Sequence, residues 1–561
     1  MKKWETVSKF KSQKSKVKIE EIIEILLENR GLKTKKEIDN FLNPRDPNDL
    51  TPADVGIDES QLNSVLKRLA AAVKNKESVV VYADYDADGI TAGAIMWETL
   101  YKPGAKAMPY IPHRVEEGYG LSKKGIEFVK ENYHPQLIVT VDHGVTAYEK
   151  IEFAKKIGIE VIVTDHHVKP KVLPKCLMVH TTKLSGAGIS WFVAKEFLKR
   201  NPSVLKGLTF TNELIALTAI GTIADMVPLV GANRSIAKYG LSAMSQTKRV
   251  GLRALINDAG ITTKTLGTYD ISHIIAPRLN AMGRIEHALD ALRLLCTNNK
   301  VKAEELAKKL GLTNKERQQM TLETTMHALG LLPKNPKKLI FVSHTEYNQG
   351  VIGLVAGKIV EEYYRPAIVV AKGEIYSKAS ARSISGFNIV EAIRSASDLL
   401  VDVGGHPMAA GFTVETEKLS LLRSFLEKRS QEVLDSRMLT RTLKIDLVLP
   451  LGRISQELYN EIQKLSPFGM GNPEPTFMSE NVMIEDMRTV GEGGKHLKIK
   501  VKNQRSKIKG QFDGIGFGMG ERMEELRIGD KADIIYAIDE NRWNGKTSLQ
   551  LKIKDIKRKA V

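Results

Sequence analysis

Three short apolar runs dominate the hydrophobic pattern in the first third of the chain. SVVVYAD ends at Asp84, LIVTVD ends at Asp142 and VIVTD ends at Asp165. Each run is rich in β-branched residues and is bounded by acidic residues, as expected of strands buried on both faces of a parallel sheet. Helical patterns separate the runs, including TAGAIMWETLY after Gly89. Because strands alternate with helices, we predict a doubly wound α/β domain over residues 73–235.

The pattern changes three times along the rest of the chain. Residues 236–335 are mainly helical and include a run from KAEELAKKL to TTMHALGLL that is long enough to connect two domains. A second α/β pattern, with KKLIFVSH and PAIVVAKG as strands, occupies residues 336–435. Over residues 436–561, short β-rich runs such as HLKIKVKN alternate with turns, which is typical of a small OB-type barrel. Residues 1–72 are expected to form short helices.

The predicted fold class is therefore α/β. It consists of two α/β domains joined by a long helical connector, plus a C-terminal OB-type β-barrel. The chain has 561 residues, which is too many for one hydrophobic core and agrees with several domains.

The net charge, the cysteines and the absence of long apolar runs indicate which binding partners and which cellular compartment to expect. The formal net charge of +18 favours a polyanion, although a generally lysine-rich surface would give the same surplus. Cys176 and Cys296 lie far apart without CxxC spacing, which predicts neither a disulfide framework nor a zinc site and suits a reducing cytoplasm. The sequence has no signal-peptide pattern and no run of about eighteen apolar residues, so we expect a cytoplasmic protein without a membrane partner.

The residues that follow the predicted strands carry the chemistry. The first strand leads into DYDADG, the second into DHG and the third into DHH, while a further acid lies in ALTAIGTIADMVPL. In open α/β sheets, ligands bind at the carboxyl ends of the strands. We therefore expect these side chains to converge on one crevice: Asp84, Asp86, Asp88, Asp142, Asp165, His166, His167 and Asp225.

Each of these motifs has a simpler interpretation when it is taken alone. DYDADG also suits a solvated turn or a calcium loop, the paired histidines a capped strand end, and Asp225 a helix or loop cap. Together, so many carboxylates in one crevice repel one another by several kcal/mol per pair unless cations neutralise them. Carboxylate and imidazole ligands without thiolate favour Mn²⁺ or Mg²⁺, and the number of acids favours two ions. Two such metals indicate hydrolysis of a phosphate ester or anhydride.

Longer motifs carry a resemblance to a known family. ADYDADG, VDHGVTA, TDHH and GTIADMVPL resemble, in order, the four motifs of the DHH phosphoesterase family. IAPRLNAMGR, NQGVIG, ARSISGFN, GGHPMAAGF and PFGMGNPEP resemble its RecJ branch, so that the similarity spans nearly the whole chain. The resemblance implies a metal-dependent 5′-to-3′ exonuclease that hydrolyses single-stranded DNA to mononucleotides in DNA repair and recombination. A helicase and a single-strand-binding protein are the further partners it suggests.

The resemblance also implies roles for individual residues. The metal ligands would be Asp84, Asp86, Asp88, Asp142, His166 and Asp225. Asp165 would orient a neighbouring ligand and His167 would face the scissile phosphate, which makes Asp142, Asp165, His166 and His167 the candidate catalytic residues. The residues that would bind DNA phosphates are Arg114, Arg278, Asn280, Arg284, Ser380, Arg382 and His406. On the barrel, Trp543 and Phe468 are candidates for stacking with unpaired bases, although each is equally suited to a core.

Two segments depart from the family pattern. Ala83 stands where glycine is common, and LSGAGISWF, around residues 185–192, is a looser match. Neither is expected to touch a proposed ligand.

Three rival functions remain open at this point. The chain could be a DHH phosphodiesterase acting on oligoribonucleotides or cyclic dinucleotides, but the C-terminal barrel and the basic charge count against this. It could be an inactive nucleic-acid-binding scaffold, but all four acidic motifs are intact. An inorganic pyrophosphatase would leave no role for the long C-terminal part.

Overall fold

The computed structural model describes residues 2–8, 18–201, 209–262, 266–503, 510–543 and 546–559. Contacts between residues divide the chain into two compact units. The larger unit comprises Asp46–Val227 and Ala232–Arg441. The smaller unit comprises Met1–Arg45, Pro228–Gly231 and Thr442–Val561. Among the residues described, no helix is both long enough and apolar enough to cross a membrane.

The first sheet of the larger unit is entirely parallel, and its strands run in the order β3-β2-β4-β5-β6. The strands are β2 (Ser78–Ala83), β3 (Lys106–Tyr110), β4 (Leu137–Val141), β5 (Glu160–Asp165) and β6 (Leu177–His180). The three apolar runs of the sequence form β2, β4 and β5, as predicted. Their carboxyl ends therefore meet at the same edge of the sheet.

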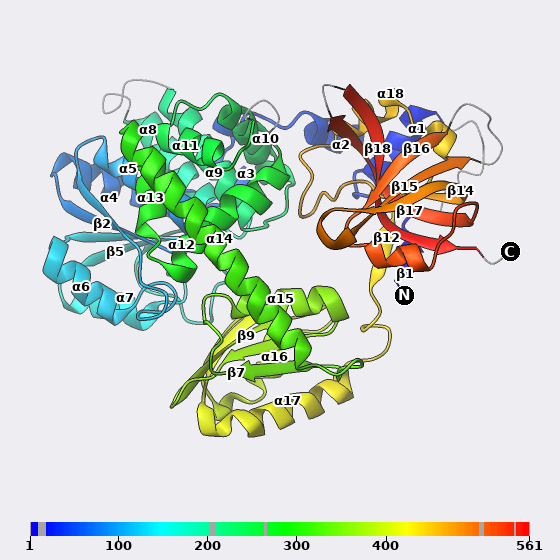
Figure 1. Ribbon diagram of the computed structural model, residues 1–561. Coiled ribbons are helices and arrows are strands. Elements are labelled where there is room, and N and C mark those ends of the chain that lie inside the picture. The colour runs from blue at the N-terminus through cyan, green and yellow to red at the C-terminus, as the bar shows by residue number, and fades with distance from the viewer. Residues whose placement is uncertain are drawn as a thin grey trace. The chain divides into compact units, whose positions relative to one another are not determined.

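Helices cover both faces of this sheet (Figure 1). On one face, α6 (Lys123–Tyr133) and α7 (Tyr148–Lys156) pack against alternate residues of the central strands, such as Val80 and Tyr82. On the other face, α5 (Ala87–Tyr101) contacts β2 and β3, and α8 (Gly186–Arg200) contacts β4 and β5. The domain is thus doubly wound, as the alternating pattern predicts.

Further helices surround and extend the first sheet. They are α3 (Pro52–Val55), α4 (Glu59–Lys74), α9 (Thr209–Ala224), α10 (Gly231–Ser245), α11 (Val250–Asp258), the π-helix η3 (Asp270–Ile275), α12 (Ala276–Ile285) and α13 (Leu289–Cys296). The long connector expected from the sequence is α14 (Lys300–Gly330), a single helix of 31 residues. It contacts α11 and α12 at one end and α15 near the other.

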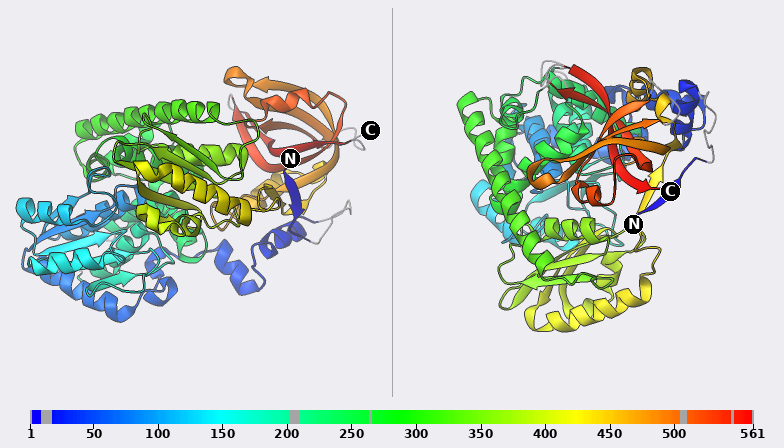
Figure 2. Two further views of the ribbon diagram at one scale, coloured as in Figure 1. Left: turned by 90° about the horizontal axis from the view of Figure 1, so that it is seen from below. Right: turned by 45° about the vertical axis from the view of Figure 1, so that its right-hand side comes forward.

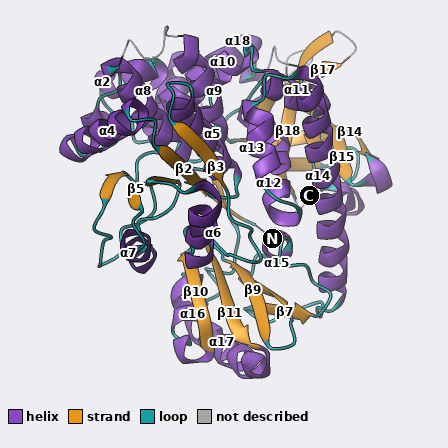
Figure 3. Cartoon of the chain, turned by 90° about the vertical axis from the view of Figure 1, so that its left-hand side faces the viewer, coloured by secondary structure: helices purple, strands orange, loops and turns teal. Residues whose placement is uncertain are grey.

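The second sheet has the order β10-β11-β9-β8-β7, in which only β7 and β8 are parallel. Its strands are β7 (Ile340–His344), β8 (Ala367–Ala371), β9 (Tyr376–Arg382), β10 (Leu400–His406) and β11 (Ala409–Glu415). Helix α15 (Ile352–Tyr363) packs on one face. Helices α16 (Ile389–Arg394) and α17 (Leu419–Val433) pack on the other face, as Figure 3 shows.

The smaller unit contains a closed five-stranded barrel, seen in orange and red in Figure 2. Its strands are β14 (Phe477–Val490), β15 (His496–Asn503), β16 (Gln511–Gly516), β17 (Lys531–Trp543) and β18 (Lys546–Arg558). Pairing of β14 with both β15 and β17 closes the ring. This is the OB-type barrel that the sequence predicts.

The N-terminal residues pack with this barrel. Strand β1 (Lys3–Thr6) pairs in parallel with β12 (Thr442–Ile445), and the Trp4 indole donates a hydrogen bond to Asp555 at 2.8 Å. The remaining elements here are α1 (Ile19–Glu28), α2 (Lys35–Leu42), β13 (Leu447–Val448) and α18 (Gln456–Gln463). The expectation of short helices over residues 1–72 thus omitted β1. The domain boundaries drawn from the sequence stay predictions.

Candidate functional site

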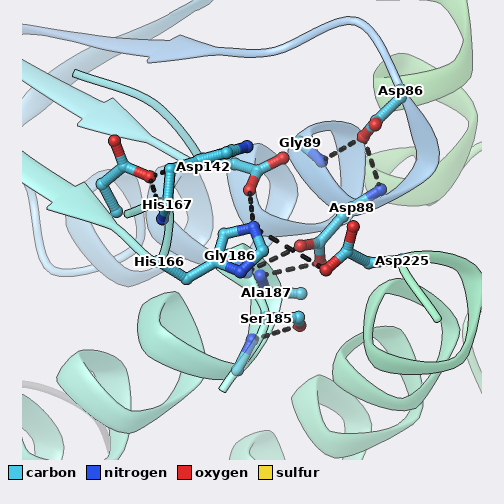
Figure 4. Close-up of polar contacts among 12 residues, drawn as sticks. Asp86, Asp88, Gly89, Asp142, His166, His167, Ser185, Gly186, Ala187 and Asp225 are labelled. Carbon is cyan, nitrogen blue, oxygen red and sulfur yellow. Dashed lines mark hydrogen bonds and ion pairs between the residues drawn. The ribbon is translucent and has the colours of Figure 1, made fainter. Parts of the chain in front are cut away.

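The acidic and histidine residues singled out from the sequence meet at the carboxyl edge of the first sheet. Asp84 follows β2, Asp142 follows β4, Asp165 ends β5, and Asp225 follows α9. Figure 4 shows Asp88, Asp142 and Asp225 arranged around His166. Three groups have ligand atoms within 4.8 Å of one another: Asp142 with His166 and His167, Asp88 with His166 and Asp225, and Asp84 with Asp86 and Asp142.

The DYDADG loop is fixed by the first turn of α5. Asp86 caps this helix, because its Oδ1 accepts hydrogen bonds from the backbone N–H groups of Asp88 and Gly89, both at 3.0 Å. The backbone N–H of Ala87 donates to Asn280 Oδ1 at 2.6 Å. The turn therefore presents its three carboxylates in one defined arrangement.

Asp88 is held from the other side by the beginning of α8. Its carboxylate accepts hydrogen bonds from the backbone N–H groups of Gly186 at 2.6 Å and Ala187 at 2.9 Å. A side chain at Gly221 would collide with Asp88 Oδ1, so glycine is needed there for close approach. Free N–H groups and the positive end of a helix dipole both favour an anion at this position.

These contacts correct one expectation from the sequence. The loosely matching segment LSGAGISWF was expected not to touch a proposed ligand, yet Gly186 and Ala187 belong to it and bind Asp88 directly. The looser match did not reveal this because the donors are backbone groups, which the side-chain pattern of a segment does not encode.

His166 lies between two carboxylates. Its Nε2 is 3.1 Å from Asp142 Oδ1 and 3.7 Å from Asp225 Oδ2. Burial, followed by the neighbouring His167, lowers the pKa of His166 to about 4. The imidazole is therefore neutral at pH 7, which is the form that binds a metal ion.

Ionisation of the carboxylates in the cluster is unfavourable in the absence of a cation. Burial and then neighbouring acids raise the pKa of Asp142 and Asp84 well above the usual value. The same causes raise the pKa of Asp88 to about 6 and that of Asp225 to about 8. Asp84 Oδ1 is also buried without a hydrogen-bond partner among the described residues. Divalent cations would offset the repulsion between the carboxylates and would give the Asp84 oxygen a partner. The donor set therefore fits Mn²⁺ or Mg²⁺.

Asp165 contacts His167 and the backbone. It accepts hydrogen bonds from the Val145 N–H at 2.8 Å and the His167 N–H at 3.0 Å, and it lies 2.8 Å from His167 Nδ1. Burial raises the pKa of Asp165, but the hydrogen bonds from His167 outweigh it and the net pKa is lowered. The pair therefore fixes the ring of His167 so that Nε2 is directed away from Asp165, toward the Tyr119 hydroxyl at 3.2 Å.

A group of arginines adjoins the acidic cluster. Arg114 lies over the Tyr85 ring at 4.8 Å, Arg284 donates to the Gly350 carbonyl oxygen at 3.0 Å, and Arg382 donates to Ser380 Oγ at 3.2 Å. Burial, followed by Arg114 and Arg382, lowers the pKa of Arg284 to about 9. Guanidinium groups that destabilise one another in this way form a site for an anion such as phosphate.

The other predicted phosphate ligands have different surroundings. His406 is exposed at the end of β10, and burial, Arg382 and then His167 lower its pKa. The Asn280 side-chain oxygen is used by Ala87, as described above. Arg278 donates to the Ile274 carbonyl oxygen at 3.0 Å and lies 3.7 Å from Asp258, so it contacts the neighbouring helices η3 and α11.

Comparisons with known proteins agree with this geometry. Three family models match: the DHH family N-terminal domain at residues 78–222, the DHHA1 domain at 336–432 and the RecJ OB domain at 445–555. The single-stranded-DNA-specific exonuclease RecJ of Bacillus subtilis is 36% identical over 561 residues, covering 98% of this chain and 69% of that protein. RecJ of Haemophilus influenzae is 31% identical and covers 95% of both chains. This chain belongs to the RecJ family.

Solved structures of the RecJ family extend the similarity to three dimensions. A crystal structure of RecJ from Thermus thermophilus in complex with Mn²⁺ has a TM-score of 0.83 at 30% identity, covering 100% of this chain and 80% of that one. A second structure of that protein is in complex with Mg²⁺. The acidic and histidine groups of the present chain are positioned to hold such ions.

Two side chains near the site did not emerge from the sequence. Tyr119 lies in an irregular loop and contacts His167, and Arg317 in α14 lowers the pKa of Arg284 by its charge. Neither has a distinctive pattern, because a tyrosine in a loop and an arginine in a polar helix are common. Of the barrel candidates, Phe468 packs against the core, and the Trp543 side chain lies outside the described residues.

Proposed function

We propose that this chain is a metal-dependent 5′-to-3′ exonuclease that hydrolyses single-stranded DNA to mononucleotides in DNA repair and recombination. The observation that carries the proposal is the convergence of six carboxylate and imidazole groups beside a group of partly buried arginines. The names of the related proteins support the choice of substrate.

Each part of the site has a role in this proposal. Asp84, Asp86, Asp88, Asp142, His166 and Asp225 would hold two Mn²⁺ or Mg²⁺ ions, which supply the Lewis acidity that phosphodiester hydrolysis needs. Asp165 fixes the ring of His167, which would face the scissile phosphate. Arg114, Arg284, Ser380, Arg382 and His406 would bind backbone phosphates. Arg278 and Asn280 stay predicted phosphate ligands, and each also contacts a neighbouring segment of the chain. Contacts to phosphates rather than bases make cleavage indifferent to sequence and sensitive to salt.

We also propose a cytoplasmic location and two kinds of protein partner. The free cysteines Cys176 and Cys296 suit a reducing compartment. An exonuclease limited to unpaired DNA needs a helicase to open duplexes. It also meets a single-strand-binding protein wherever that protein covers the unpaired strand.

Direct assay of the purified chain tests the proposal. Single strands, blunt duplexes and RNA, each labelled at either end, are incubated with Mn²⁺, Mg²⁺ or EDTA. We expect metal-dependent release of mononucleotides from the 5′ end of single-stranded DNA. Release that begins at the 3′ end, equal digestion of blunt duplex, or a preference for short RNA would refute it. Binding without cleavage would favour the inactive scaffold.

A further inference from the structure

The loop between β3 and α6, residues 111–122, carries two side chains to the crevice. Arg114 stacks over Tyr85 at 4.8 Å. The Tyr119 hydroxyl lies 3.2 Å from His167 Nε2 and donates to the Asp142 carbonyl oxygen, also at 3.2 Å. The loop forms turns and bends but no helix or strand, and the Glu117 N–H donates a backbone hydrogen bond to the His113 carbonyl oxygen at 2.9 Å within it. This single turn leaves the two ends of the loop to be held by side-chain contacts.

The carboxylate of Glu117 supplies that interaction. Its Oε1 accepts a hydrogen bond from the backbone N–H of His113 at 2.7 Å. Its Oε2 accepts from the Tyr110 hydroxyl at 2.8 Å and from Ser122 Oγ at 3.4 Å. One side chain thereby ties the beginning and the end of the loop to the last residue of β3.

The space around this carboxylate is shaped to receive it. Gly125 lies in the first turn of α6, and a Cβ atom there would be 2.6 Å from Glu117 Oε2 and would collide with the Tyr82 hydroxyl. Ser122 caps the same helix by accepting from the Gly125 N–H at 2.9 Å. The negative charge thus lies near the amino end of α6, where the helix dipole stabilises it.

The preceding residue, Glu116, provides an internal contrast. It pairs with Lys124 at 3.3 Å, and the two side chains are 62% and 65% exposed. Exposed ion pairs of this kind contribute little to stability, because solvent and salt screen them. The two adjacent glutamates therefore have different contacts. Glu117 accepts hydrogen bonds from both ends of the loop, whereas Glu116 lies on the surface.

We propose that Glu117 is a positioning residue of this enzyme, which holds loop 111–122 so that Arg114 and Tyr119 face the crevice. The inference rests on the proposed nuclease function. Without the carboxylate, the loop samples other conformations and Arg114 is less often in place to bind the strand. The expected loss is therefore mainly in KM for single-stranded DNA.

Four variants of the full chain test this role: Glu117→Ala, Glu117→Gln, Tyr110→Phe and, as the matched control, Glu116→Ala. We expect Glu117→Ala to raise KM about 10-fold, with a smaller change in kcat. Glutamine keeps the size and one acceptor oxygen, so Glu117→Gln should recover most of the loss. Tyr110→Phe removes one of the three donors and should have an intermediate effect. Glu116→Ala should match the wild type.

Hydrogen–deuterium exchange provides a readout that does not depend on activity. In Glu117→Ala without metal, amides of residues 111–122 should exchange faster than in Glu116→Ala, while exchange elsewhere is unchanged. Equal loop exchange in the two variants, kinetics of Glu117→Ala that match Glu116→Ala, or faster exchange throughout the domain would each overturn the inference. If the wild type and Glu116→Ala cleave no DNA, the proposed function fails, whereas the exchange experiment still decides whether Glu117 holds the loop.

Discussion

The two ends of helix α5 carry buried carboxylates in opposite circumstances. At its amino end, Asp88 meets other acids and a neutral histidine, and its pKa is raised to about 6. Near its carboxyl end, Glu98 accepts hydrogen bonds from Arg249 at 2.6 and 2.8 Å and from Lys102 at 2.7 Å. Burial raises the pKa of Glu98, but Arg249 and Lys102 together outweigh it and the net pKa is lowered.

This contrast distinguishes a structural charge from a functional one. A buried charge that is paired with a counter-ion is part of the structure. A buried charge that is surrounded by like charges needs a ligand of opposite charge. The arginines follow the same rule. The pKa of Arg249 is raised because its hydrogen bonds with Glu98 outweigh burial, but burial and like charges lower the pKa of Arg284. The acidic and basic groups of the crevice are thus complementary to cations and to phosphate, respectively.

Removing one acid at the functional end should have the largest effect. Asp142→Asn is the suitable change, because Asp142 has a φ of 68° and asparagine tolerates this region better than alanine does. We expect cleavage of single-stranded DNA in Mn²⁺ to fall at least about 1000-fold. The melting temperature in EDTA should stay equal or rise, because repulsion is relieved. A rate within about 10-fold of wild type would contradict the assignment.

Breaking the structural pair should instead reduce stability. Glu98→Met leaves Arg249 buried without a counter-ion, which should lower the free energy of unfolding by about 3–5 kcal/mol. Denaturant unfolding measures this change. The double variant Glu98→Met with Arg249→Met is the control, since an apolar pair should restore much of the loss. If Glu98→Met lost cleavage without losing stability, Glu98 would have a functional role, and the contrast between the two ends of α5 would be wrong.

The unpaired acids should also make the metal-free protein pH-dependent. Asp225 has a pKa of about 8, above its value of about 4 in an unfolded chain, so the folded state binds more protons between these values. Stability in EDTA should therefore fall as the pH rises from 5 to 8. Mn²⁺ should reverse this trend, because it binds the ionised form. Melting curves that are independent of pH in EDTA would contradict the expected repulsion.

Weakening the arginine group should have the smallest effect of the four. Arg284→Lys keeps the charge but loses two-pronged binding of phosphate, so KM for single-stranded DNA should rise about 10-fold with kcat less affected. Kinetics at several salt concentrations would measure this. Arg253→Lys, at an exposed position of α11, is a control expected to have no effect. An equal response of the two variants would remove Arg284 from the phosphate site.

Much of this site could be anticipated from the chain. The acids stand where apolar runs end, and local periodicity predicts both the strands and their parallel direction, which together bring Asp84, Asp142 and Asp165 to one edge. The contacts of Asp88 with α8 could not be anticipated. Its partner Gly186 is 98 residues away and binds through a backbone N–H group. Tyr119 and Glu117 likewise act through loop geometry that no periodic pattern specifies.

The sequence by itself determined the alternation of strands and helices in the first sheet, the metal-ligating chemistry and the family, because these depend on residue types and on short-range patterns. Only the tertiary structure decided which buried charges are paired, as for Glu98, and which are not, as for Asp142. It also paired β1 with β12, more than 400 residues along the chain, in the unit that contains the barrel. The physical reason is that a residue's identity fixes its charge, whereas the free energy of that charge depends on distant groups that packing brings to it.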